Sequence, residues 1–86
     1  MLKVLVRQRE VEQFLAKHNL SQGAFAARLG VSDGYMSQLL RGTRYPSAKL
    51  RARMLRSLRK ATFDDIFEIV DDDELKLVTS RQTKEQ

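Results

Sequence analysis

The sequence predicts an all-α domain of five short helices, with a small β pairing of the two chain ends as an open addition. Apolar residues recur at i, i+3, i+4 and i+7 along most of the first 70 residues, which is the period of an amphipathic helix. Serine, glycine or proline separates several of these runs, where helices begin and end. The expected helices cover residues 7–18, 21–29, 32–41, 48–60 and a segment that opens at Thr62.

Length and composition limit the class of protein. The chain has 86 residues, which is enough for one domain with a modest core, and no cysteine, which excludes a disulfide framework and a thiolate metal site. It has neither an apolar run long enough to span a membrane nor a signal-peptide pattern. We therefore expect a cytoplasmic protein with no membrane partner.

Charge is distributed unevenly along the chain. The net charge is +5, but residues 1–60 hold 13 Lys and Arg against 3 Asp and Glu, whereas residues 61–86 hold 3 against 8. A basic body with an acidic end favours a partner that is a polyanion. Charge alone is better explained by an ordinary solvated surface that happens to be basic.

The first 20 residues combine a short apolar run with a helix. Residues 1–6 (MLKVLV) fit either a strand or an extra helical turn, and residues 75–78 (LKLV) form the second strand-like segment with which they can pair. From residue 7 the pattern becomes helical, with Val11, Phe14 and Leu15 on one face.

Residues 21–42 (SQGAFAARLGVSDGYMSQLLRG) are the stretch around which the chain is organised. Ser21 and Ser32 are placed to cap two helices, and Gly30 stands between them, where a positive φ ends the first helix without steric cost. Ala26 leaves room for close approach of the second helix. Two helices crossing steeply around a short glycine turn form a helix-turn-helix, whose second helix enters the major groove of DNA.

This stretch resembles the helix-turn-helix domains of the lambda-repressor and Cro type. The resemblance rests on Ser21-Gln22, Ala26, Gly30, Met36, Leu39, Gly42, Pro46-Ser47 and residues 63–67 (FDDIF), and it covers about residues 8–70. It implies a five-helix, lambda-repressor-like DNA-binding domain over residues 1–70, with the motif at 21–42. It further implies a transcriptional regulator that binds double-stranded DNA, a repressor that occludes its operator, and a homodimer on a two-fold site.

The expected base contacts lie on the second motif helix. Residues 34, 37, 38 and 41 share one face, and Gln38 is the strongest candidate because a glutamine amide can bond to adenine N7 and N6 together. Asp33 either accepts from cytosine N4 or stabilises the helix N-terminus, and both roles stay open. The full set of expected base contacts is Ser32, Asp33, Gly34, Ser37, Gln38 and Arg41.

The expected phosphate contacts come from two places. Gln22 matches a position that clamps a phosphate in the resembled family, and the free N–H groups of a helix N-terminus favour an anion there. Thr43, Arg44 and Tyr45 supply hydroxyl and guanidinium donors in the loop after the second motif helix, and Lys49 follows at the next helix start.

The last two helices are expected to close the core. Leu50, Met54, Leu55 and Leu58 form the apolar face of residues 48–60. Thr62 and Asp65 have the spacing of a capping box, and the apolar face that follows comprises Phe63, Ile66, Phe67 and Val70.

The chain end is expected to serve contacts with other proteins. Ile69 and Val70 are expected at an exposed end that can serve a dimer contact. Residues 71–86 are acidic and then polar, so we expect a flexible tail and a possible site for a protein partner.

Two alternatives to a repressor remain open at this point. The first is an antitoxin-type autoregulator that binds its own promoter, and the second is a protein-interaction module that keeps the fold without binding DNA. An enzyme is not expected, because the sequence contains neither a nucleophile–base set nor a metal-ligand cluster nor a phosphate-binding glycine loop. No cofactor is expected.

Overall fold

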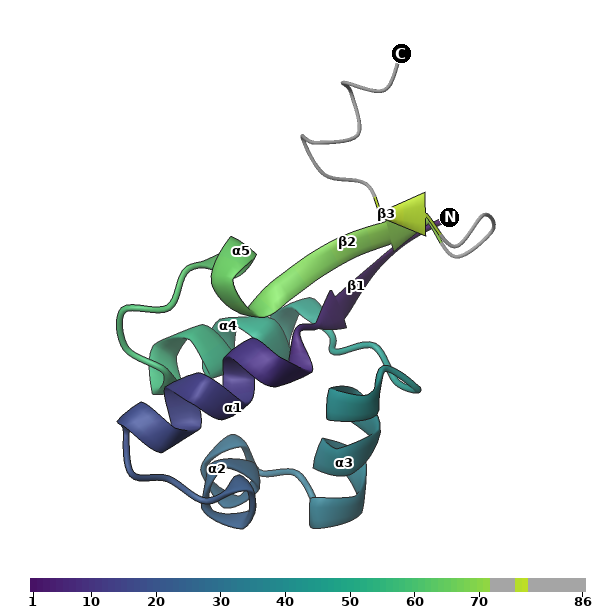
Figure 1. The fold of residues 1–86 in the computed structure, drawn as a ribbon. Coiled ribbons are helices and arrows are strands. Elements are labelled where there is room, and N and C mark those ends of the chain that lie inside the picture. Colours follow the sequence, from purple (N-terminus) through teal and green to yellow (C-terminus); the bar gives the residue numbers. More distant parts are fainter. Residues whose placement is uncertain (72–75, 78–86) are drawn as a thin grey trace.

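A computed structural model describes residues 1–71 and 76–77 of the chain and shows five helices and three strands (Figure 1). In chain order these elements are β1 (Leu2–Val6), α1 (Gln8–Lys17), α2 (Gln22–Leu29), α3 (Asp33–Arg41), α4 (Ala48–Ser57), α5 (Phe63–Ile66), β2 (Phe67–Asp71) and β3 (Lys76–Leu77). The expected five-helix fold with a small β pairing is confirmed.

Local caps explain why α2, α3 and α4 begin where they do. Ser21, Ser32 and Ser47 each precede one of these helices in extended backbone. Each serine oxygen accepts the backbone N–H three residues further on, at 3.0 to 3.1 Å. Each bond satisfies an amide that the first helical turn leaves without a partner.

The helices enclose one apolar core. Phe25, Met36, Leu39, Met54 and Leu58 are fully buried within it. Because burial of such side chains is the main favourable term in folding, this cluster fixes how the five helices pack. The other buried hydrophobic residues of this core are Val6, Val11, Leu15, Ala26, Leu29, Leu40, Leu50, Ile66 and Phe67.

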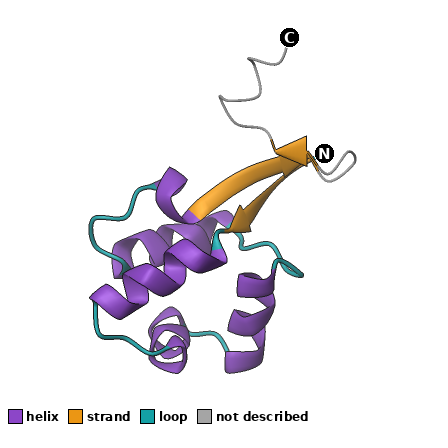
Figure 2. Cartoon of the chain, in the orientation of Figure 1, coloured by secondary structure: helices purple, strands orange, loops and turns teal. Residues whose placement is uncertain are grey.

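The strands form a small antiparallel sheet that projects from the helical body (Figure 2). β1 pairs with β2 from Leu2 opposite Asp71 to Val6 opposite Phe67, and β3 adds to the other side of β2. The expected strand pairing is therefore confirmed in kind but wrong in its partner. The first strand pairs with residues 67–71 and not with residues 75–78.

The expected continuation of the fifth helix to Val70 is wrong. The helix ends at Ile66 and the chain continues as β2. Ile66 and Phe67 are both fully buried, and Ile69 and Val70 are β-branched residues that favour a strand. Pairing with all five residues of β1 satisfies the backbone in the extended form.

Two further expectations concern the ends of elements. The fourth helix ends at Ser57 and not at Lys60, which has a positive φ of 73°. The expected flexible tail, residues 71–86, lies mostly outside the described residues; of these, the structure places Asp71 in β2 and residues 76–77 in β3.

Arg7 ties the helical body to the sheet. Its Nε donates to the carbonyl oxygens of Phe67, at 3.0 Å, and Asp64, at 3.1 Å, while its Nη1 lies 3.4 Å from a Glu68 carboxylate oxygen. Its backbone N–H donates to Ile66 at 2.8 Å. Arg7 thereby holds the chain where α5 changes into β2.

We predict that Arg7→Lys lowers the free energy of unfolding by about 1–3 kcal/mol. A lysine ammonium cannot reproduce the two hydrogen bonds that the Arg7 Nε donates to the carbonyl oxygens of Asp64 and Phe67. The matched control is Arg9→Lys, at an exposed position, which should change stability by less than about 0.5 kcal/mol. Urea denaturation followed by circular dichroism measures both. Equal effects of the two substitutions would contradict the role assigned to Arg7.

Candidate nucleic-acid interface

The turn between α2 and α3 is built as a Schellman motif. Gly30 has a φ of 75°, its N–H donates to Ala27 at 3.1 Å, and the N–H of Val31 donates to Ala26 at 3.0 Å. Ala26 is only 1% exposed, so its small side chain lies inside the packing of the motif. The glycine turn expected from the sequence is confirmed, and it fixes the direction in which α3 leaves α2.

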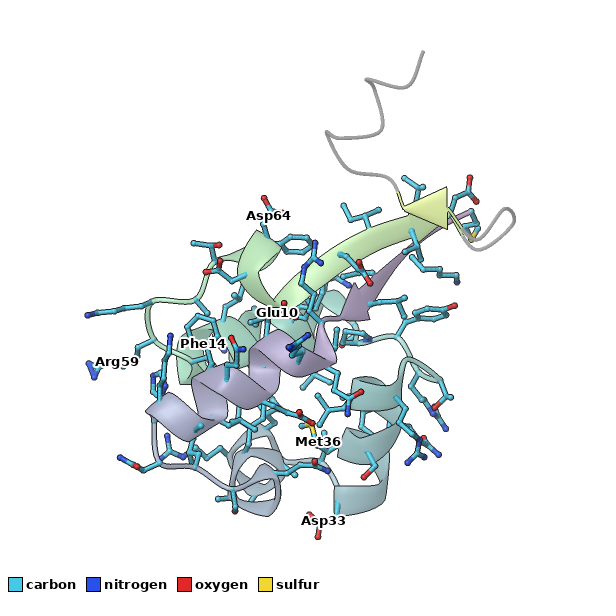
Figure 3. All side chains as sticks on the ribbon, viewed as in Figure 1. Glu10, Phe14, Asp33, Met36, Arg59 and Asp64 are labelled. Carbon is cyan, nitrogen blue, oxygen red and sulfur yellow. The ribbon has the colours of Figure 1, made fainter. Side chains whose placement is uncertain are left out.

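α3 has one buried face and one open face. Met36 is directed into the body, whereas Asp33 lies at the outer end of the helix (Figure 3). The expected reading face is accessible, since Gly34 and Arg41 are exposed and Ser37 and Gln38 are half-buried. A Cβ placed on Gly34 would meet no atom within 4 Å, which shows that this part of the face is open.

The start of α2 is joined to the open face of α3. The Gln22 amide nitrogen donates to the Ser37 hydroxyl at 3.2 Å. Gln22 therefore lies beside the expected base-reading residues, and it is at the N-terminus of its helix. Ser32 uses its hydroxyl to cap α3, and Asp33 is in the first turn of that helix, where a negative charge is favourable.

The loop after α3 begins with a second Schellman motif. Gly42 has a φ of 82° and donates to Leu39 at 3.2 Å, and the N–H of Thr43 donates to the Gln38 carbonyl at 3.0 Å. The Thr43 hydroxyl donates to the same carbonyl at 3.2 Å. The loop is thus anchored directly on the residue expected to read a base.

Arg44 and Tyr45 continue this anchored loop. The Nε of Arg44 donates to the Gln38 side-chain oxygen at 2.9 Å, and its guanidinium lies 5.3 Å from the centre of the Tyr35 ring. Tyr45 is 41% exposed, and the Lys3 ammonium lies 5.3 Å from its ring. Lys49 is exposed in the first turn of α4.

The structure brings most of the expected site residues into two groups. Gln22 joins Ser37, and Thr43 and Arg44 join Gln38. In the described part of the chain, no side-chain hydrogen bond joins Tyr45 or Lys49 to these groups. The sequence did not identify Lys3 as a member, because β1 reaches the loop only through the fold and no local signal marks that lysine.

The electrostatics of this surface favour an anion. Asp33 is the only acidic residue between Glu12 and Asp64 in the sequence. The surface carries the positive side chains of Arg41, Arg44 and Lys49, together with amide and hydroxyl donors. Such groups bond to phosphate oxygens and to the edges of bases.

A helix-turn-helix family model matches residues 11–66, which is more than half of the chain. The chain belongs to the helix-turn-helix family. The match is of the lambda-repressor and Cro type, so the protein is a DNA-binding transcriptional regulator with double-stranded DNA as its partner. No curated protein and no solved structure matches it. The matched segment runs from within α1 to the end of α5, so β1 and β2 lie outside it.

The membrane question has a simple structural answer for the described residues. None of the helices placed there combines the length and the apolar character that crossing a bilayer requires.

We predict opposite effects on stability for two glycine substitutions in the motif. Gly30→Ala should destabilise the protein by about 1–2 kcal/mol, because a Cβ strains the left-handed backbone at φ 75°. Gly34→Ala is the control: its site is helical and open, so alanine should stabilise α3 by about 0.5–1 kcal/mol. Thermal denaturation of both variants gives the comparison. If Gly30→Ala left the stability unchanged, position 30 would not require the conformational freedom of glycine.

Proposed function

We propose that this protein is a cytoplasmic, sequence-specific repressor that occludes an operator in double-stranded DNA. The observation that carries the proposal is that the loop after α3 is hydrogen-bonded to the open face of α3. Both Thr43 and Arg44 of this loop donate hydrogen bonds to Gln38. Residues suited to base edges and residues suited to phosphates thereby form one continuous surface. A helix inserted in the major groove needs neighbouring phosphate contacts to fix its position and orientation on the duplex.

The two kinds of contact have different tasks in this proposal. Ser32, Asp33, Gly34, Ser37, Gln38 and Arg41 read base edges from α3. Gln22, Thr43, Arg44, Tyr45 and Lys49 bind phosphates and supply most of the affinity, because neutralising phosphates releases counterions. Lys3 joins the phosphate contacts, since its ammonium lies beside the Tyr45 ring.

We propose that the protein acts as a homodimer on a two-fold operator. One α3 is nine residues long and reads only a few base pairs, so two copies are needed for a selective site. The sheet offers the surface for pairing. β1 is an edge strand, because its one partner in the described sheet is β2.

Within the described residues, the side of β1 that faces away from β2 has the properties of a strand-pairing surface. The N–H of Arg7 donates to Ile66, and the alternation of an antiparallel ladder then directs the backbone groups of Leu2 and Val4 away from β2. The Leu2 side chain is 58% exposed. An unpaired edge with apolar side chains is a template for a second strand, and the occupant we propose is β1 of a second copy.

We predict that Gln38→Ala relaxes the preference at one base pair of the half-site by about 1–3 kcal/mol. Lys49→Ala should instead weaken binding to all duplexes alike and reduce the slope of log affinity against log salt by about 1. Selection of sites from random duplex DNA, followed by affinities at several salt concentrations, measures both effects.

The same selection tests the proposed function itself. A short motif recovered as a palindrome supports a dimeric, sequence-specific regulator. Recovery of no motif, with only weak and salt-sensitive binding, would contradict operator reading and would favour a protein-interaction module.

We predict that Leu2→Glu raises the dissociation constant of the dimer at least tenfold, because a charged side chain on an edge strand opposes its pairing with a second strand. Glu12→Gln, at an exposed position on α1, is a control that should leave the dimer unchanged. Sedimentation equilibrium reports the constant. A dimer of undiminished stability in Leu2→Glu would exclude β1 as the interface.

A further inference from the structure

We infer that Arg44 is a positioning residue for base recognition: it holds the Gln38 amide in one orientation, so that the amide presents N–H donors to the base. The inference rests on the proposed function and deepens it. It replaces the simpler expectation that Arg44 only binds a phosphate.

The backbone sets up this contact before any side chain is considered. The Gln38 carbonyl accepts both the N–H and the hydroxyl of Thr43, at 3.0 and 3.2 Å, so the first loop residue after Gly42 is fixed on α3. Arg44 follows immediately. Its side chain therefore starts from a defined position next to the outer face of α3.

Two side chains of α3 then hold the guanidinium. Its Nε donates to the Gln38 side-chain oxygen at 2.9 Å, and its central carbon lies 5.3 Å from the centre of the Tyr35 ring. Tyr35 and Gln38 are three residues apart, so both lie on neighbouring positions of one helical surface. The Tyr35 ring is half-buried and packs against the core, which gives the guanidinium a fixed platform.

This arrangement selects one of the two orientations of the amide. A glutamine amide turned by half a rotation would direct its NH₂ at the guanidinium, donor against donor, and the 2.9 Å bond would be lost. In the orientation held by Arg44, the amide nitrogen makes no hydrogen bond within the part of the chain that the structure describes. Its two hydrogens remain for a ligand.

The chemistry of the read base follows from this orientation. Gln38 presents a donor, so its partner is an acceptor in the major groove: N7 of a purine, O6 of guanine or O4 of thymine. Adenine remains compatible with bidentate reading, because the Gln38 oxygen has a second lone pair beside the one used by Arg44. Cytosine N4 can donate to that same lone pair, but it leaves the amide N–H donors unmatched, so cytosine is disfavoured at this position.

A positioning role and a phosphate role predict different results for Arg44→Lys. Lysine keeps the positive charge that a phosphate senses, but it lacks the planar group that bonds to Gln38 and stacks on Tyr35. We expect Arg44→Lys to reduce the base preference at the position read by Gln38 by about threefold to tenfold, the worth of one ordinary hydrogen bond. Total affinity for random duplex DNA and its salt dependence should stay close to wild type.

The controls separate the loss of Gln38 positioning from the general effect of replacing an arginine by a lysine. Arg59→Lys makes the same chemical change on the side of the molecule away from α3 (Figure 3), and it should alter no base preference. In the background of Gln38→Ala, Arg44→Lys should have no further effect on preference, because the amide it positions is gone. Tyr35→Phe should preserve the preference, whereas Tyr35→Leu should reduce it.

Three results would overturn the inference. These are an equal loss of affinity on all sequences, an unchanged preference in Arg44→Lys, and full additivity of Arg44→Lys with Gln38→Ala. Circular dichroism of each variant checks that the fold is intact.

A measurement without DNA keeps this test distinct from that of the proposed function. The Gln38 side-chain NH₂ resonances of the free protein should shift, and their order parameter should fall, in Arg44→Lys but not in Arg59→Lys. If the wild type selects no motif, the proposed function fails, while this spectrum still decides whether Arg44 holds the amide. Unchanged Gln38 resonances in Arg44→Lys would overturn the inference directly.

Discussion

The left-handed turn at Gly30 is the constraint on which the rest of the structure depends. A φ of 75° and two hydrogen bonds of 3.0 and 3.1 Å return the chain against the end of α2, and the small Ala26 lets α3 pack closely. Once α3 is fixed, Met36 and Leu39 complete the core and the polar residues of the helix are left on the open side. The same device recurs at Gly42, where it fixes the loop relative to Gln38.

The sheet is a second unit with a different role in this account. It lies outside the segment that matches the helix-turn-helix family, and Arg7 joins it to the helical body through carbonyls on both sides of the α5–β2 junction. In our proposal, the helices carry the reading surface, whereas the edge of β1 that is unpaired in the described sheet receives a second copy. If the protein dimerises through β1 as we propose, the operator spacing depends on the sheet and the motif is left unchanged.

Features governed by neighbouring residues could be predicted from the sequence, and features governed by distant ones could not. Ser21, Ser32 and Gly30 determine helix ends locally, so α2 and α3 were predicted to within a residue. β2 was predicted as helix, because the spacing of its apolar residues fits both forms and its true partner, β1, is more than 60 residues away. The contact roles at the site remain predictions, and the bond between Arg44 and Gln38 had no signal in the sequence, since it depends on how the loop folds back.

The most direct test of the account is to map the DNA-binding face by backbone amide chemical shifts, titrating the protein with a selected operator duplex. We predict the largest changes in α3, at Gln22 and in residues 43–45. The test is demanding because the molecule has a second basic surface, lined by Arg28, Arg56 and Arg59, which would also attract DNA by charge alone. Changes centred on those arginines, with α3 unaffected, would contradict the claim that α3 reads the operator.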